Sequence, residues 1–251
     1  MKILNIIKKI ISYLVLPICI IIYKIIKPKT LIVFGMHRSG TSCITRILNQ
    51  NGLSLGSEII QPDGGNPHGY WENLVVYWIN ERILRLSNGS WENPPKILYE
   101  NLYIKIEILR FIYVRNLKNP HLIIKDPRIV LTWHIWKKYL RNYDILAVFR
   151  NPNSVAKSLL NRDHMKIEKG LKLWTIYNQK ILSISNKEKI QFLNFDNDQV
   201  FKLRIKQIIE NLNLEFKENS LNFYNPSFKK SDIFEPHLEN KIYKKLLKKL
   251  N

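Results

Sequence analysis

The turn after an early apolar run carries residues of the types that bind anions. Within LIVFGMHRSGTSCITRILNQNG, residues 31–52, the candidates are Gly35, His37, Arg38, Ser39, Gly40, Thr41 and Ser42. The hydroxyls can donate hydrogen bonds, the arginine supplies a fixed charge, and the glycines permit a sharp turn. A strand that turns here into a helix also points backbone N–H groups and the positive end of the helix dipole at a ligand. The pattern predicts an anion site, although a plain strand–helix connection also uses Ser and Thr as caps.

This loop differs from the usual nucleotide-phosphate loop in the position of its cation. That pattern, Gly-x-x-x-x-Gly-Lys-Ser/Thr, matches Gly35 and Gly40, but Thr41 stands where the lysine belongs. A metal-assisted kinase or ATPase uses the lysine to reach the terminal phosphates. The positive charge lies at Arg38 instead, which counts against a kinase.

A second candidate anion group follows another apolar run. Arg150 stands where the run ILAVF meets a helix start marked by Asn151 and Pro152, and Ser158 lies two helical turns further on. Ligands of open parallel sheets bind at the carboxyl ends of strands, so this arginine is placed to contact a phosphate. The alternatives for Arg150 are a structural ion pair and a surface position.

Four short apolar runs must position these groups, and helical sequence follows each run. They lie at residues 30–35, 121–126, 143–150 and 189–196. Apolar runs that alternate with helices predict a parallel sheet covered on both faces. Further helices are expected at about 73–87, 97–117, 167–185, 198–213 and 239–250. Residues 214–236 lack periodicity and are expected to form a loop with at most a short strand. The predicted fold class is α/β, a P-loop-containing three-layer fold with a central parallel sheet.

Length and composition fit one domain with an anionic partner. The chain has 251 residues, is 45% hydrophobic and carries a net charge of +20. Such a charge suits nucleic acid, an anionic membrane or a polyanionic small molecule, although the basic residues are spread along the chain. Cys19 and Cys43 lack the spacing of metal ligands or of a redox pair. We expect no disulfide, no metal and no nucleic-acid partner.

The N-terminal segment is strongly apolar. Residues 10–23, IISYLVLPICIIIY, contain no charged residue, and lysines flank them on both sides. A membrane span needs ~20 apolar residues, so the run is short, although neighbouring isoleucines extend it. We expect residues 1–29 to form a hydrophobic helix that attaches the protein to a membrane, and residues 30–251 to form the folded domain. The alternative is a buried helix of the fold.

Beyond the loop, several motifs of the chain are similar to those of a known family. They are RSGTS (38–42), NPHGYWEN (66–73), WENPP (91–95), IIKDPR (123–128), VFRNPNSVAKSLLNRD (148–163), GLKLWTIYN (170–178) and FLNFDN (192–197), in this order. Over roughly residues 30–200 the sequence resembles bacterial carbohydrate-type sulfotransferases that use 3′-phosphoadenosine-5′-phosphosulfate. The resemblance implies transfer of a sulfuryl group to a hydroxyl of a glycan or glycolipid, without a divalent metal.

The resemblance also implies roles for particular residues. In the family, the loop with Arg38 holds the 5′-phosphosulfate. An arginine and a serine eight positions later, here Arg150 and Ser158, hold the 3′-phosphate. Related carbohydrate sulfotransferases place a catalytic glutamate in the loop after the first helix, which indicates Glu72 as the base. A strand-end lysine contacts the sulfuryl group, which indicates Lys125.

Alternatives to these roles follow from the residues themselves. An acidic residue at position 72 could simply open the helix that begins at Asn73. His37 and His68 are alternative bases. His68 and Trp71 lie in the loop on the acceptor side. Arg128, beside Lys125 in the motif IIKDPR, is a third candidate for binding the acceptor, although it could instead pair with Asp126.

Two rival functions remain. One is a P-loop nucleotide-dependent kinase, and the other is a non-catalytic basic protein of the same fold that binds a membrane surface or nucleic acid. For a bacterial source, in which activated sulfate is made in the cytosol, we expect a membrane-associated protein whose catalytic domain faces the cytoplasm.

Overall fold

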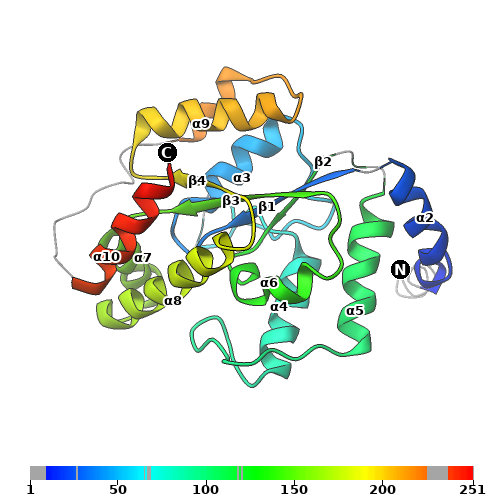
Figure 1. The fold of residues 1–251 in the computed structure, drawn as a ribbon, viewed down its shortest axis with the longest axis horizontal. Coiled ribbons are helices and arrows are strands. Elements are labelled where there is room, and N and C mark those ends of the chain that lie inside the picture. Colours follow the sequence, from blue (N-terminus) through cyan, green and yellow to red (C-terminus); the bar gives the residue numbers. More distant parts are fainter. Residues whose placement is uncertain are drawn as a thin grey trace.

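A sheet of parallel strands forms the centre of the molecule. The computed structural model describes residues 10–26, 28–64, 66, 69–117, 119, 121–224 and 237–250. Four parallel strands in the order β2-β1-β3-β4 make the sheet (Figure 1). They are β1 Lys29–Phe34, β2 His121–Lys125, β3 Tyr143–Phe149 and β4 Ile190–Asn194. Each strand overlaps one of the predicted apolar runs, so the prediction of an α/β fold with a parallel sheet is confirmed.

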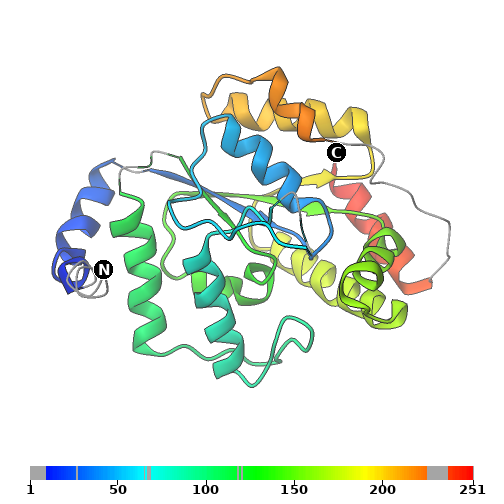
Figure 2. The ribbon, with the colours of Figure 1, turned by 180° about the vertical axis from the view of Figure 1, so that it is seen from behind.

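Helices cover both faces of the sheet and complete three layers (Figures 1 and 2). The α-helices after β1 are α3 Thr41–Gln50, α4 Leu74–Leu86, α5 Leu102–Leu109, α6 Ile129–Trp136, α7 Pro152–Asp163, α8 Ile167–Ser185, α9 Asp198–Asn211 and α10 His237–Leu247. Shorter helical turns are η1 Arg110–Arg115, η2 Glu218–Phe223 and η4 Lys248–Leu250. Helices α3 and α9 lie on one face of the sheet, and α4, α5, α6 and α8 lie on the other.

The alternation of side chains along each strand divides the core into two clusters. In β1, Leu31 and Val33 pack with residues of α3 and α9, whereas Ile32 and Phe34 pack with residues of α4, α5, α6 and α8. Apolar side chains on both faces are what a parallel strand requires when helices cover it on both sides.

Side-chain caps determine where several helices begin. Asn73, Asn101, Asn151 and Asn197 each stand at an N-cap and accept a hydrogen bond from a backbone N–H of the first turn. The cap at Asn101 explains why the helix expected from residue 97 begins only at residue 102. It then continues as the π-helical turn η1. In the segment expected to be irregular, residues 214–217 have no regular structure, the 3₁₀ turn η2 follows them, and residues 225–236 lie outside the described residues.

The N-terminal helix α2, Leu16–Ile26, packs one side against η1. Cys19 and Tyr23 are buried there, and the rings of Tyr23 and Tyr113 meet edge to face with their centroids 4.6 Å apart. Within the part of the chain that the structure describes, no helix combines the length and the apolar character needed to cross a bilayer. Membrane attachment and the domain boundary after residue 29 stay predictions.

Candidate active site

The loop between β1 and α3 contains two glycines that have no space for a side chain. A Cβ on Gly35 would lie 2.7 Å from the carbonyl oxygen of Val148 in the neighbouring strand, and a Cβ on Gly40 would lie 2.3 Å from the ring of Phe195. Gly40 has a φ of 91° and stands at the N-cap of α3, where no side chain caps the helix. The first N–H groups of α3 therefore have no side-chain acceptor at the N-cap, as an anion site requires.

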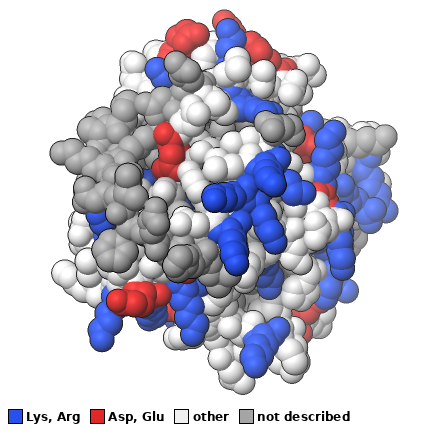
Figure 3. All heavy atoms as spheres, turned by 60° about the vertical axis from the view of Figure 1, so that its left-hand side comes forward, with Lys and Arg blue, Asp and Glu red and all other residues white. Residues whose placement is uncertain are grey.

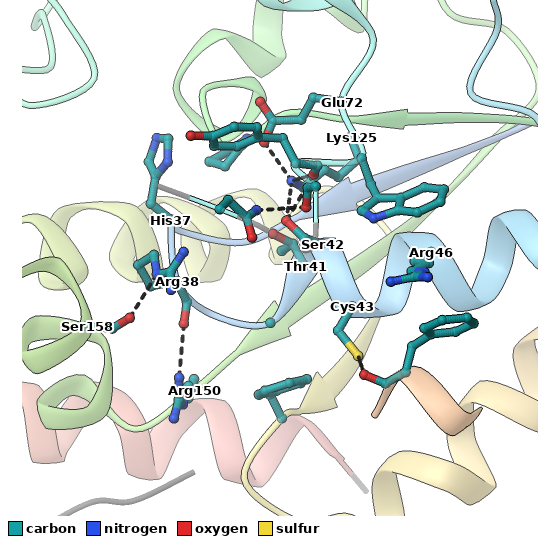
Figure 4. Close-up of a pocket in the computed structure, with 18 of the residues that line it drawn as sticks. His37, Arg38, Thr41, Ser42, Cys43, Arg46, Glu72, Lys125, Arg150 and Ser158 are labelled. Carbon is teal, nitrogen blue, oxygen red and sulfur yellow. Dashed lines mark hydrogen bonds and ion pairs between the residues drawn. The ribbon is translucent and has the colours of Figure 1, made fainter. Parts of the chain in front are cut away.

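Arg38 contacts both members of the second predicted anion group. Its φ is 67°, in the left-handed region, and this conformation costs a non-glycine residue roughly 1 kcal/mol. Its Nε donates a hydrogen bond to Ser158 Oγ at 2.8 Å, and its carbonyl oxygen accepts one from Arg150 Nη1 at 3.5 Å (Figure 4). Burial, and then the charges of Arg162 and Arg150, lower the pKa of Arg38. The structure therefore brings the three candidate anion ligands together.

Arg150 is fixed at the end of β3 by contacts on several sides. Its side chain is buried, and its Nε lies 3.7 Å from Asp196 Oδ1. Asp196 Oδ2 also accepts the N–H of Asn151 at 2.6 Å and the hydroxyl of Tyr243 at 2.9 Å. The indole N–H of Trp174 donates to the Arg150 carbonyl at 2.9 Å. Burial lowers the pKa of Arg150, while Asp196 raises it. These contacts hold the guanidinium beside the loop.

Glu72 and Lys125 form a buried ion pair on another wall of the site. Their exposed fractions are 5% and 2%, and Lys125 Nζ lies 2.6 Å from Glu72 Oε1. The ammonium also donates to Ser42 Oγ at 3.1 Å and to the Tyr70 carbonyl at 2.8 Å (Figure 4). Burial raises the pKa of Glu72, whereas the charges of Lys125 and Arg128 lower it. Ser42 therefore connects this pair directly to the loop.

The contacts of Glu72 bear on the alternative that it opens a helix. Asn73 is itself the N-cap of α4 and accepts the N–H of Val75 at 2.9 Å. The Glu72 carboxylate instead pairs with Lys125. A buried carboxylate can accept a proton from a bound hydroxyl, and the ammonium beside it can stabilise a departing anion.

Two of the remaining candidates also border the site. The His37 ring lies 4.3 Å from the ring of Trp91, and its Nε2 is buried with no hydrogen-bond partner among the described residues. Burial, followed by the charge of Arg128, holds the pKa of His37 well below the usual histidine range, so its imidazole is neutral at pH 7. Trp71 has a φ of 56°, unusual for so large a residue. His68 lies outside the described residues.

Arg128 is part of a buried charge network. Its Nε donates to Glu81 Oε1 at 2.6 Å, and its Nη1 donates to both carboxylate oxygens of Asp126 at 3.1 Å. Its guanidinium also lies over the ring of Tyr77, 4.5 Å from the centroid. Because these partners occupy the guanidinium, the geometry favours the structural pair with Asp126 over contact with an acceptor.

Most candidates line one cavity of about 580 Å³ (Figure 4). They are His37, Arg38, Gly40, Thr41, Ser42, Trp71, Glu72, Lys125, Arg150 and Ser158. Three other candidates do not line it: Gly35, Ser39 and Arg128. Among the residues that the structure describes, no cluster of His, Cys, Asp and Glu is arranged to hold a metal ion.

Other cavity residues were missed in the sequence. Arg46 and Arg162 both line the cavity. Each follows a candidate, Ser42 or Ser158, by four positions in the same helix, so helical spacing could have indicated them. Phe223 reaches the cavity from η2, and the Arg46 guanidinium lies over its ring, 3.3 Å from the centroid. No local pattern marks this residue, because the tertiary fold brings η2 to the cavity.

Comparisons with known proteins bear on the fold. Neither a family model nor a curated protein matches the sequence. The sulfotransferase domain of the olefin synthase from Synechococcus PCC 7002 has a similar structure, with a TM-score of 0.59 and 14% identity over 88% of this chain and 94% of that one. Sulfotransferase STF1 from Mycobacterium tuberculosis aligns with a TM-score of 0.46 and 9% identity over 78% of this chain and 70% of that one. The first of these similarities shows that the chain has the fold of a sulfotransferase domain.

Proposed function

We propose that the protein transfers a sulfuryl group from 3′-phosphoadenosine-5′-phosphosulfate to a hydroxyl group. The observation that carries the proposal is the arrangement of two anion-binding groups and a buried carboxylate–ammonium pair around one cavity. The loop with Arg38 meets Arg150 and Ser158, and Ser42 connects it to Lys125. A nucleotide that carries anionic groups at both its 3′ and 5′ positions needs two such sites.

The residues present fit this co-substrate, which supplies an activated sulfuryl group and a phosphate leaving group when it is bound. The N-terminus of α3 has no side-chain cap, and the buried Nε2 of His37, a residue of the cavity wall, has no hydrogen-bond partner among the described residues. Buried polar groups are nearly always satisfied, so such groups beside a cavity suit an anionic ligand. Thr41 at the usual lysine position favours this P-loop variant over a nucleoside triphosphate site.

In the proposed reaction, a bond forms between the acceptor oxygen and sulfur, and the bond between sulfur and the 5′-phosphate oxygen breaks. Glu72 receives the proton of the acceptor hydroxyl, and Arg38 and Lys125 stabilise the charge on the leaving phosphate. Lys125 can bind a ligand oxygen if it exchanges one of its three hydrogen bonds. Exchange of the bond to Glu72 would remove a cation from the carboxylate and raise its proton affinity just when a base is needed.

We further propose a glycan or glycolipid acceptor and attachment to a membrane. The N-terminal segment exposes seven large apolar side chains, with exposed fractions from 51% to 75%: Ile10, Ile11, Leu14, Ile18, Ile21, Ile25 and Ile26. An exposed apolar surface flanked by lysines suits a lipid interface. For a bacterial source we propose the cytoplasmic surface of the membrane as the place of the domain and a sugar or lipid-linked sugar as the acceptor, with Trp71 on the acceptor side of the cavity.

The experiment that tests this proposal offers two donors to the full-length protein in detergent. Sulfur-labelled 3′-phosphoadenosine-5′-phosphosulfate and γ-labelled ATP are each incubated with a panel of glycans and glycolipids. We expect label transfer from the sulfate donor, and a large loss of transfer in Glu72→Gln. Transfer from ATP would support the kinase instead, and absence of both transfer and nucleotide binding would support the non-catalytic alternative.

A further inference from the structure

A second hollow lies between α8 and α10 and shares no lining residue with the first cavity. Its volume is about 760 Å³, and its walls are formed by Gln179, Leu182, Ser183, Asn186, Lys241, Ile242, Lys244, Lys245, Lys248 and Lys249. Half of these residues are lysines, and none is acidic. Figure 3 brings forward the side of the molecule on which α7, α8 and α10 lie, and it shows basic side chains gathered near the centre of that face.

The lysines of this basic groove form one face of a helix. They occupy positions 241, 244, 245, 248 and 249, a spacing that places them together along α10 and into η4. All five are exposed, whereas Ile242 and Leu246 on the inner side are buried. Each lysine has another lysine three or four positions away, and like charges at this spacing destabilise a helix. An anionic partner along this face would remove that repulsion.

The opposite wall of the groove indicates the chemistry of the partner. Gln179 and Ser183 of α8, and Asn186 directly after that helix, present amide and hydroxyl groups, which can donate hydrogen bonds to sugar hydroxyls and accept them. None of the described residues that line the groove is aromatic, whereas proteins that bind single-stranded nucleic acid use aromatic rings to stack the bases. A helix that lies on a bilayer turns its apolar side toward the lipid, but α10 turns Ile242 and Leu246 into the fold.

We propose that the basic groove binds an acidic polysaccharide, a sugar chain that carries carboxylate or sulfate groups. The lysines pair with the carboxylate or sulfate groups of the polysaccharide, and the polar side chains of the opposite wall form hydrogen bonds with its hydroxyls. This binding does not depend on the transfer reaction proposed above. The other side of α10 nevertheless supports the first cavity, because Tyr243 donates to Asp196, the partner of Arg150.

Dextran sulfate and uncharged dextran of equal length test the groove on the full-length protein in detergent. Fluorescence anisotropy of labelled chains should show binding of dextran sulfate and little binding of dextran. A triple variant, Lys244→Gln, Lys245→Gln and Lys248→Gln, should weaken the binding by about tenfold or more, because three charge contacts are lost. Its affinity should also depend less steeply on salt concentration, because fewer counterions are released.

A matched triple variant removes the same charge elsewhere. Lys105→Gln, Lys202→Gln and Lys217→Gln alter exposed lysines outside the groove and should leave the affinity within about twofold. Equal weakening in both triple variants would overturn the proposal, because net charge alone would then explain the binding.

The remaining outcomes separate this groove from other sites and other partners. Arg150→Ala should bind dextran sulfate with the affinity of the native protein. A loss of affinity in this variant would place the polyanion in the first cavity. Tighter groove-dependent binding of a single-stranded oligonucleotide, or of anionic vesicles, would also overturn the assignment. Thermal unfolding should show that the variants are folded. If the triple variant unfolds, Lys248→Gln with Lys249→Gln provides the same test at the end of the helix.

Discussion

Lys125 is the residue at which the loop and the carboxylate wall of the cavity meet. Its three hydrogen bonds reach Ser42, Tyr70 and Glu72, so all three donors of the ammonium are in use. An anion that binds Lys125 must replace one of these partners. Binding at the loop and basicity at Glu72 are therefore physically coupled in the proposed enzyme.

Glu72→Gln should lower turnover by roughly 10²- to 10⁴-fold, because the amide keeps the shape of the side chain but cannot accept a proton. Co-substrate affinity, measured by calorimetry, should change little. Glu81→Gln is the control, since it also removes the carboxylate partner of a buried cation, here Arg128, but lies outside the cavity. Near-native turnover in Glu72→Gln would assign the base to another residue, and His37→Ala and His68→Ala would follow.

The pH dependence of the rate gives a separate test of the same residue. Burial raises the pKa of Glu72, and the base must be deprotonated to act. The value of kcat/KM should therefore rise as the pH rises through a midpoint above the usual glutamate range, and fall as the pH drops below it. This acid limb should be absent from the residual activity of Glu72→Gln. A limb that persists unchanged in the variant would belong to a different group.

Arg150→Ala should remove the preference for adenosine 3′,5′-bisphosphate over adenosine 5′-monophosphate. Loss of one partner of a buried charge pair costs about 2 to 5 kcal/mol, and calorimetry with the two nucleotides measures the difference directly. Arg115→Ala is the control, because that arginine pairs with Glu58 at the surface and does not line the cavity. An Arg150→Ala protein that still distinguishes the nucleotides would place the 3′-phosphate elsewhere.

The site residues differ in how far the sequence could indicate them. Arg38, Lys125 and Arg150 follow apolar runs, and the ends of parallel strands meet at one edge of the sheet, so their approach could be predicted. The direct bond from Arg38 to Ser158 could not, because it depends on how α7 is placed beside the loop. The same holds for Phe223, which belongs to a turn distant in the sequence.

At the scale of elements, the strands and most helix starts could be predicted from the sequence, and the start of α5 is the exception. Each strand is a short run that is apolar on both faces, and this pattern is visible without the fold. The start of α5 depends on the single cap Asn101, and the π-helical turn η1 after it has no recognised local signal. Periodicity alone therefore gave one helix from residue 97 to residue 117, where the structure has two elements.

Gly40, the N-cap of α3 in the turn after β1, should not tolerate a side chain. Gly40→Ala places a Cβ against the Phe195 ring in a residue with a φ of 91°, so both overpacking and strain should lower the free energy of unfolding, by about 1 to 3 kcal/mol. Urea unfolding measures the loss. Gly64→Ala is the control, because a Cβ there meets no atom within 4 Å. Equal stability of the two variants would show that the loop can shift to accept a side chain.

At the scale of the whole molecule, one side of the N-terminal segment packs against the rest of the fold, and the other side is exposed. Tyr13 donates to Glu107 at 2.9 Å, Arg110 Nε donates to Ser12 at 2.8 Å, and Tyr23 packs against Tyr113. Deletion of the segment would therefore uncover part of the core as well as remove the exposed isoleucines. Substitutions on the outer side alone separate the two effects, because they leave the docking contacts in place.

Ile18→Gln, Ile21→Gln and Ile25→Gln together should release the protein from membranes while the domain stays folded. These side chains have exposed fractions of 59%, 59% and 75%, so their replacement removes apolar surface available to lipid but little packing. Transfer of exposed isoleucines into lipid is favourable, and we expect binding to vesicles with anionic lipid to weaken by at least about tenfold. Co-sedimentation measures the binding, and thermal unfolding checks the fold.

Leu86→Gln, Leu160→Gln and Leu203→Gln form the control, because they alter exposed leucines outside the N-terminal segment. If the isoleucine variant sediments with vesicles as the native protein does, while the control also remains bound, the segment serves the fold and not the membrane.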